Sequence, residues 1–153
     1  VRDESSLELR DRHKTRRVIQ ESLRLFPPAW ILSRTAQKSV SLDRVTIPKN
    51  WLVVLSPFIT HRHPDYWPEP EKFRPQRFEG ETQRPTYSYW PFGGGGRNCI
   101  GRHFAMSEMS IVLPKLLNRF NVRYVGEETP TPYAMVTLRP AAGLPVNLVR
   151  RTL

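Results

Sequence analysis

Cys99 is the only cysteine of the chain; it follows a run of four glycines and precedes a segment with helical periodicity. A helix amino terminus presents free N–H groups and the positive end of the helix dipole, which favours a thiolate over a thiol. Arg97 adds a positive charge two residues away. Glycines let the backbone turn tightly and approach a sulfur anion or a large planar ligand. The segment therefore predicts a thiolate that serves as a metal ligand or a nucleophile.

Other glycine-rich sites fit this segment less well. Gly96 and Gly101 have the spacing of a phosphate-binding loop, but Arg102 and His103 stand where that loop needs lysine and serine or threonine. A dinucleotide-binding fingerprint lacks its third glycine here. His103 lies one helical turn from Cys99, so a cysteine nucleophile with a histidine base stays an alternative, without an evident oxyanion site. An inert buried cysteine is the remaining one.

Periodicity and turn residues predict the elements that position Cys99. Apolar residues at helical spacing end at Leu25, before Pro27 and Pro28. The proline-rich segment 57–91 carries many aromatic residues and is expected to be an ordered meander rather than a helix. Pro114 should kink the second helix or remove a hydrogen bond from it. We predict helices at 11–25 and 101–120, strands at 31–36, 39–41, 44–47 and 51–55, and short strands over 122–149 separated by Pro130, Pro132, Pro140 and Pro145.

Charge and cysteine content narrow the classes of partner. The formal charge of +10 predicts an anionic partner. The densest basic run, residues 10–17, contains Asp11 and no aromatic residue, which favours a solvated helix face over a nucleic-acid surface. We therefore expect no nucleic-acid partner. A single cysteine excludes an internal disulfide and a multi-cysteine zinc site, and it fits a reducing compartment.

The apolar stretches are short. The longest, residues 51–59, cannot cross a bilayer, and the first residues are charged rather than typical of a signal sequence. We expect a cytoplasmic protein. Because the chain begins at Val1 within a charged segment, we also expect that an amino-terminal part precedes it, which leaves a membrane anchor open.

Three motifs together resemble one family. Residues 92–101 have the pattern Phe-x-x-Gly-x-Arg-x-Cys-x-Gly, which matches the cysteine loop of the cytochrome P450 superfamily at every fixed position. Glu21 and Arg24 resemble the Glu-x-x-Arg helix of that family. Residues 73–78 resemble its meander motif Phe-x-Pro-Glu-Arg-Phe, with Gln76 in place of the usual glutamate. The chain is thereby identified as a member of this superfamily.

The resemblance implies an α+β chain that is mainly α in the full-length family. Residues 1–153 would be the carboxy-terminal portion of a single catalytic domain, without the amino-terminal part and the distal, oxygen-activating helix. Residues 126–129 mimic the motif of that helix, but they run into Pro130 and are expected to form a turn.

The resemblance also assigns roles to residues. Cys99 would be the catalytic residue and the axial ligand of the haem iron, and Glu21, Arg24 and Arg77 would form a buried structural triad. His61 and His63 would be structural, in a short helix before the meander. The other haem-binding residues would be Arg97, Phe92, Gly95, Gly101 and Arg34, and the substrate pocket would include Ala29, Trp30, Ile31, Met135 and Val136.

The implied function is that of a haem-dependent monooxygenase, which inserts one atom of dioxygen into a small apolar organic substrate. The cofactor would be haem b, with electrons from NAD(P)H delivered by a reductase or by a ferredoxin- or flavodoxin-type donor that docks on the basic surface. The alternatives are a haem-thiolate protein with non-oxygenase chemistry, such as a peroxide isomerase, a dehydratase or a peroxygenase, and an inactive fragment. By itself, this chain is expected to be inactive.

Overall fold

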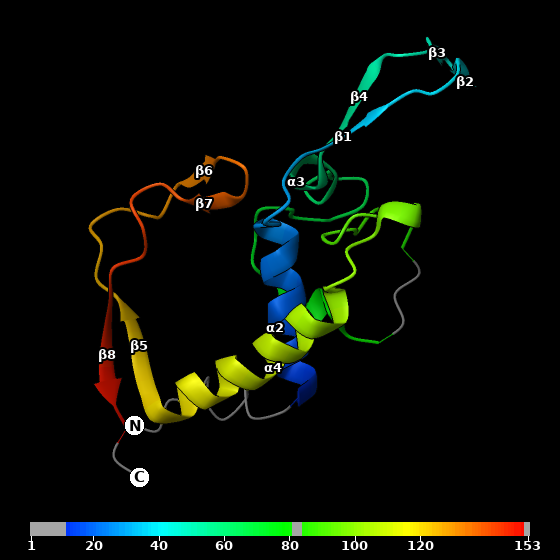
Figure 1. Cartoon of the computed structure of the whole chain (residues 1–153). Helices are drawn as coiled ribbons and strands as arrows, with labels where there is room; N and C mark the ends of the chain where they lie inside the picture. The colour runs from blue at the N-terminus through cyan, green and yellow to red at the C-terminus, as the bar shows by residue number, and fades with distance from the viewer. Residues whose placement is uncertain (1–11, 81–83, 152–153) are drawn as a thin grey trace.

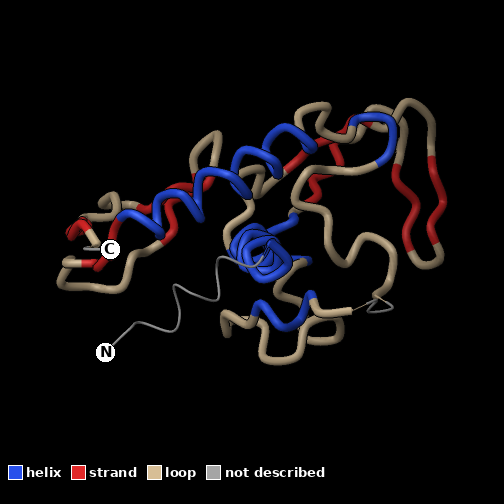
Figure 2. Tube along the Cα trace, turned by 90° about the horizontal axis from the view of Figure 1, so that it is seen from below, coloured by secondary structure: helices blue, strands red, loops and turns tan. Residues whose placement is uncertain are grey.

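A computed structural model of the chain describes residues 12–80 and 84–151. Over these residues, two long helices cross near the cysteine loop, and pairs of short strands lie around them (Figures 1 and 2). The helix α2 (Arg12–Leu25) lies at the centre, and α4 (Arg102–Arg119) packs against it. The predicted start of the first helix at Asp11 lies outside the described residues.

The helix α2 supplies half of the buried residues of the described chain. Its buried residues include Thr15, Ile19 and Leu23, which follow one another at four-residue spacing and so share one side of the helix. The helix ends at Leu25, as predicted, because Pro27 lacks an N–H donor and disfavours helical geometry in the residue before it.

The predicted strands after α2 form one long hairpin arm, made of residues 32–55 (Figure 1). At its base β1 (Leu32–Thr35) pairs antiparallel with β4 (Leu52–Leu55). At its tip β2 (Val40–Leu42) pairs with β3 (Val45–Ile47) across a two-residue turn. Each predicted strand is confirmed to within a residue or two.

The meander wraps around α2 and contains two single turns of helix, α3 (Pro57–Thr60) and the 3₁₀ turn η1 (Pro75–Phe78). The placement of His61 and His63 within a short helix is wrong: α3 ends at Thr60, with His61 as its cap. Pro64 keeps His63 out of a helix, because the residue before a proline is driven away from helical geometry.

The cysteine loop connects the meander to α4 and contains the 3₁₀ turn η2 (Gly95–Arg97). Pro114 lies inside α4, which continues past it to Arg119. At the far end of α4, β5 (Phe120–Tyr124) pairs with β8 (Val146–Arg150).

A small ladder of β6 (Pro132–Ala134) and β7 (Leu138–Pro140) corrects the expectation that the tail prolines separate strands. Pro132 and Pro140 lie inside these strands and are paired with each other. Proline is tolerated there because they form the outermost pair of a ladder with two strands, where an N–H donor can be spared.

Candidate functional site

The cysteine loop folds so that the backbone around Cys99 is held by hydrogen bonds. The N–H group of Cys99 donates to the carbonyl oxygen of Phe92 at 2.9 Å and to Oδ1 of Asn98 at 3.0 Å. Gly93 and Gly95 have φ angles of +77° and +64°, which other residues adopt only with strain. These two glycines therefore permit the turn that brings Phe92 and Cys99 together.

The thiol of Cys99 is exposed and lies directly before α4. The backbone carbonyl oxygen of Cys99 accepts a hydrogen bond from the N–H of Arg102, the first residue of α4, at 3.3 Å. Gly101, the cap of that helix, is close enough that an added Cβ would lie 3.8 Å from Sγ of Cys99. The sulfur thus stands at the positive end of an 18-residue helix.

Apolar side chains beside the sulfur are exposed. Ile100 is fully exposed, and 74% of Phe104 on the first turn of α4 is accessible. Exposed apolar groups of this size next to a free thiol are suited to a large, flat, apolar ligand.

Two predicted haem-binding arginines lie on separate elements. Arg34 is on β1, and Arg97 ends η2; both are exposed. Arg34 lines a cavity of about 500 Å³ together with Gly94, Gly95 and Trp90 of the cysteine loop and its approach. Arg34 and the loop glycines, which are about sixty residues apart in sequence, are therefore brought to one cavity.

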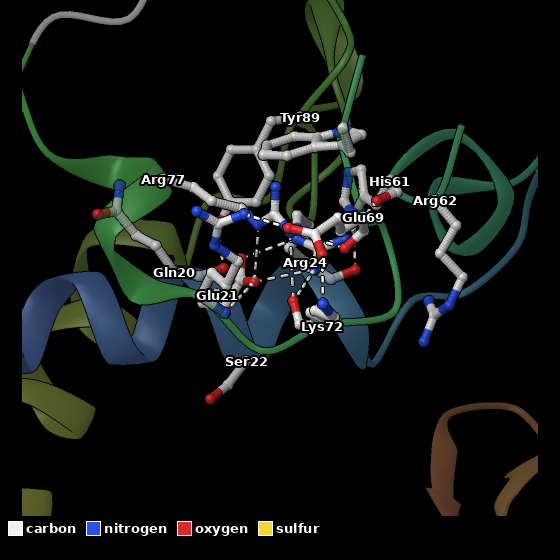
Figure 3. A network of polar contacts seen from close by, with 12 residues as sticks. Gln20, Glu21, Ser22, Arg24, His61, Arg62, Glu69, Lys72, Arg77 and Tyr89 are labelled. Atoms are coloured by element: carbon white, nitrogen blue, oxygen red, sulfur yellow. Dashed lines mark hydrogen bonds and ion pairs between the residues drawn. The ribbon is translucent and has the colours of Figure 1, made fainter. Parts of the chain in front are cut away.

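Beneath the loop, Glu21 lies at the centre of a buried ion-pair network (Figure 3). Both carboxylate oxygens bind Arg24, at 2.7 Å to Nε and 2.9 Å to Nη2. Oε1 also accepts from Nε of Arg77 at 3.3 Å and from the N–H of Arg74 at 2.8 Å. Glu21 and Arg24 are fully buried, so the structure brings together the three residues of the expected triad.

The remaining guanidinium donors are satisfied by backbone carbonyls of the meander. Arg24 donates to the carbonyls of His61 at 2.8 Å and Lys72 at 3.3 Å. Arg77 donates to those of Pro68 at 2.5 Å and Glu69 at 2.7 Å. Buried charges are tolerated where every donor is paired in this way, so the network fastens the meander to α2.

Sequence reasoning missed two members of this region. The N–H of Arg74 binds the carboxylate of Glu21, and the guanidinium of Arg84 lies 4.9 Å from the ring centre of buried Trp67. Every residue except proline carries a backbone N–H, so the sequence gives no signal for the donor of Arg74. The structure also distinguishes the two histidines for which a structural role was expected, since His61 is fully buried and His63 is exposed.

The predicted substrate residues are brought together in part. Nε1 of Trp30 donates to the carbonyl oxygen of Met135 at 2.7 Å, which ties the segment after α2 to the loop between β6 and β7. Ile31, Met135 and Val136 are exposed, with 95% of Val136 accessible. The described chain therefore leaves these apolar side chains accessible.

Taken together, the structure places a cysteine before a helix amino terminus, exposed apolar side chains shortly after it in the chain, and a buried Glu-Arg-Arg network. The family profile described as Cytochrome P450 matches residues 2–145, and the chain belongs to that family. The fold is accordingly part of the cytochrome P450 fold, as the sequence motifs predicted.

Individual relatives of the chain are also cytochromes P450 or hydroxylases. The chain is 44% identical over 123 residues to cytochrome P450 3A29 of Sus scrofa, covering 78% of this chain and 24% of that protein. It is 39% identical over 141 residues to taxane 10-beta-hydroxylase of Taxus cuspidata, covering 92% of this chain and 28% of that protein. The chain thus spans about a quarter of the length of the curated relatives it matches.

Solved structures of cytochromes P450 also resemble this chain. CYP175A1 from Thermus thermophilus superposes with a TM-score of 0.84 at 38% identity, covering 96% of this chain and 37% of that one. The retinoic acid-bound cyanobacterial CYP120A1 has a TM-score of 0.84 at 34% identity, covering 88% of this chain and 32% of that one. Within residues 12–80 and 84–151, no helix combines the length and apolar character needed to cross a membrane.

Membership of this family implies haem, and the donors present here fit that group. The accessible sulfur of Cys99 can serve as a soft iron ligand, and exposed Arg34 and Arg97 can pair with carboxylates. Ile100 and Phe104 offer the apolar contact that a porphyrin requires. The side chains of this chain therefore match the three chemical parts of a haem: iron, carboxylates and an apolar ring.

Proposed function

We propose that the protein is a haem-dependent monooxygenase in which Cys99 is the axial ligand of the iron. The observation that carries this proposal is the exposed thiol of Cys99 at the amino terminus of α4, in a loop whose backbone is hydrogen-bonded at that residue. Haem b held by a thiolate supplies the activation of dioxygen and the insertion of one oxygen atom into an organic substrate.

The other residues of the loop bind and orient the cofactor in this proposal. Arg97 and Arg34 pair with the haem propionates, because both guanidinium groups are accessible and carry fixed positive charge. Phe92 packs beside the sulfur, and its carbonyl oxygen holds the N–H of Cys99. Gly95 and Gly101 allow the loop and α4 to approach the ring.

The substrate is a small apolar organic molecule, for which Ala29, Trp30, Ile31, Met135 and Val136 form part of the pocket. The hydrogen bond from Trp30 to the carbonyl of Met135 supports this assignment, since it joins the two segments that supply these residues. Electrons come from NAD(P)H through a reductase or a ferredoxin- or flavodoxin-type partner. Residues 1–153 belong to the carboxy-terminal portion of one catalytic domain, and the activity is that of the longer protein.

The test is the difference spectrum of the reduced, carbon-monoxide-bound protein, compared between wild type and Cys99→Ser. We expect the absorption of a thiolate-ligated haem in the wild type and its complete loss in Cys99→Ser, because serine cannot supply a soft anionic sulfur. Arg123→Ser, on the exposed strand β5, serves as the control and should leave the spectrum unchanged. A wild-type spectrum typical of histidine-ligated haem would contradict the proposal.

The requirement for a reductant separates monooxygenation from the alternative chemistries. Turnover that needs NAD(P)H, a redox partner and dioxygen supports the proposal. Turnover of a peroxide with no electron donor would instead assign the protein to the isomerase, dehydratase or peroxygenase class.

A further inference from the structure

His61 makes two hydrogen bonds through its imidazole ring, one to each of two separate elements. Its ring Nδ1 lies 3.2 Å from the carbonyl oxygen of Arg24 at the end of α2. Its Nε2 lies 2.8 Å from the backbone N–H of Trp90, just before the cysteine loop. The residue is completely buried.

These two partners determine the protonation state of the ring. A carbonyl oxygen can only accept a hydrogen bond, so Nδ1 of His61 must carry a proton toward Arg24. A backbone N–H can only donate, so Nε2 must present a lone pair to Trp90. The geometry is therefore satisfied by one species, the neutral Nδ1–H tautomer, and protonation of Nε2 would set two N–H groups against each other.

His61 is also bound to the ion-pair network through its backbone. Nη1 of Arg24 donates to the carbonyl oxygen of His61 at 2.8 Å, while the His61 ring donates to the carbonyl of Arg24. The same guanidinium holds the carboxylate of Glu21. Figure 3 shows His61 beside Arg24 in this network. Both the backbone and the ring of His61 are therefore held by Arg24.

Trp90 connects His61 to the cysteine loop. Its carbonyl oxygen accepts the N–H of Gly93 at 3.0 Å, and the buried Pro91 follows it in the chain. The next residue, Phe92, accepts the N–H of Cys99 at 2.9 Å. Hydrogen bonds therefore connect Glu21 through Arg24 and His61 to Trp90, and the covalent chain from Trp90 to Phe92 continues this connection to the N–H of Cys99.

We propose that His61, as its neutral Nδ1–H tautomer, is a positioning residue that holds the entry of the cysteine loop against the buried network of Glu21 and Arg24. Its consequence for the iron rests on the proposed function, because the ligand that it positions is Cys99. Its link to Trp90 does not depend on the cofactor.

The tautomer is tested directly by nitrogen NMR of the ¹⁵N-histidine-labelled protein, in the diamagnetic, reduced, carbon-monoxide-bound state. We expect His61 to give one protonated Nδ1 and one unprotonated Nε2, with no averaging between tautomers. An Nε2–H tautomer, or rapid exchange between the two tautomers of His61, would overturn the inference. If the protein takes up no haem, the same measurement on the haem-free protein distinguishes the two tautomers equally well.

Two substitutions separate positioning from packing. The side-chain oxygen of glutamine reaches about as far as Nε2 of histidine, so His61→Gln keeps an acceptor for Trp90. The amide nitrogen of asparagine lies near the place of Nδ1, so His61→Asn keeps only the donor to Arg24. Each variant loses one buried hydrogen bond, and His63→Gln is the matched control on an exposed histidine.

We expect the carbon-monoxide spectrum of His61→Gln and His63→Gln to match the wild type. For His61→Asn, the ratio of thiolate-ligated to other haem should fall about fivefold or more, as expected when a buried N–H loses its acceptor. Equal spectra of His61→Gln and His61→Asn, or equal losses, would overturn the positioning role. Absence of the thiolate band in the wild type would instead overturn the proposed function, and the NMR result would still decide the inference.

Discussion

Glu21 brings a carboxylate into the fully buried centre of the described chain, where several hydrogen-bond donors surround it. Arg24, Arg77 and the N–H of Arg74 all donate to its two oxygens. Removing the carboxylate would leave two guanidinium groups with too few acceptors in a site away from water. Glu21 thus holds together the two arginines through which α2 is joined to the meander.

Glu21→Ala should therefore lower the free energy of unfolding by about 3–5 kcal/mol and abolish haem incorporation. The control is Glu79→Ala, which breaks an ion pair with Arg17 at 2.9 Å but whose own side chain is 61% exposed. That change should cost less than about 1 kcal/mol, because exposed ion pairs are screened by water. Urea unfolding and the haem absorbance per protein measure both; a folded, fully haem-loaded Glu21→Ala protein would refute the role.

The single residue His61 also makes the stability of the fold depend on pH. Burial, together with the charges of Arg24 and Arg62, lowers the pKa of His61 from 6.5 to about 4. The ring of Tyr89, a titratable residue of the meander, packs against the imidazole. Between these pH values the unfolded state binds more protons than the folded state, so stability is lost as the pH falls through that window.

We expect the wild type to lose about 3 kcal/mol more unfolding free energy than His61→Gln between pH 6.5 and 4. The reason is that glutamine does not titrate, so the variant lacks the preferential protonation of the unfolded chain. Urea unfolding of both proteins across this range measures the difference. Parallel stability curves for the two proteins would count against a neutral, buried His61.

At the scale of elements, the cysteine loop depends on the close approach of the meander. Tyr87 has a φ angle of +64°, and its ring lies against Gly94 so closely that an added Cβ there would be 2.5 Å from a ring carbon. Gly96, two residues on, has no atom within 4 Å of such a Cβ. The four consecutive glycines are therefore not equivalent.

Gly94→Ala should cost about 1–3 kcal/mol of unfolding free energy, because the new methyl group overlaps the Tyr87 ring. Gly96→Ala is the control and should be near neutral. Tyr87→Gly should restore the stability of the Gly94→Ala protein, since it removes the ring and tolerates a positive φ angle. Thermal unfolding of the single and double variants measures these changes, and equal effects of the two alanine substitutions would contradict the packing.

At the scale of the whole molecule, much apolar surface is left accessible on the described chain. The buried apolar side chains gather around α2, whereas α4 and the strands present many exposed ones. One groove between α2 and α4 is lined by Ile19, Leu23, Phe26, Val112 and Leu116. The chain spans about a quarter of the length of its curated relatives, so in a longer protein these surfaces have chain available to cover them.

The basic surface beside the cysteine loop belongs to the same scale. Arg16 of α2 and Arg102 of α4 line a cavity of about 330 Å³ next to Phe92 and Gly93. A cationic surface of this kind speeds the approach of an acidic redox partner, and salt weakens the effect.

Arg16→Glu should slow reduction of the haem by the partner about tenfold at low salt, with the difference shrinking as ionic strength rises. Arg123→Glu makes the same charge change on β5, at the other end of α4, and should have little effect. Stopped-flow reduction at several salt concentrations measures both rates. Equal rates for wild type and Arg16→Glu would place the docking surface elsewhere.

The sequence by itself determined the local elements and the family to which the chain belongs. Helical periodicity up to the two prolines predicted the end of α2 at Leu25, and short runs rich in β-branched and aromatic residues predicted the strands of the hairpin arm. Glu21 and Arg24 share one helix face because they are three residues apart, and the motif around Cys99 identified the family. Each of these features depends on residues that are close together along the chain.

Only the tertiary structure decided which side chains face inward. His61 and His63 lie two residues apart in the same segment, yet one ring is buried against Trp90, 29 residues away, and the other is exposed. Trp30 meets Met135 across 105 residues. These outcomes depend on contacts between distant segments, whose free energy is realised only when the whole fold has formed, so no local pattern can encode them.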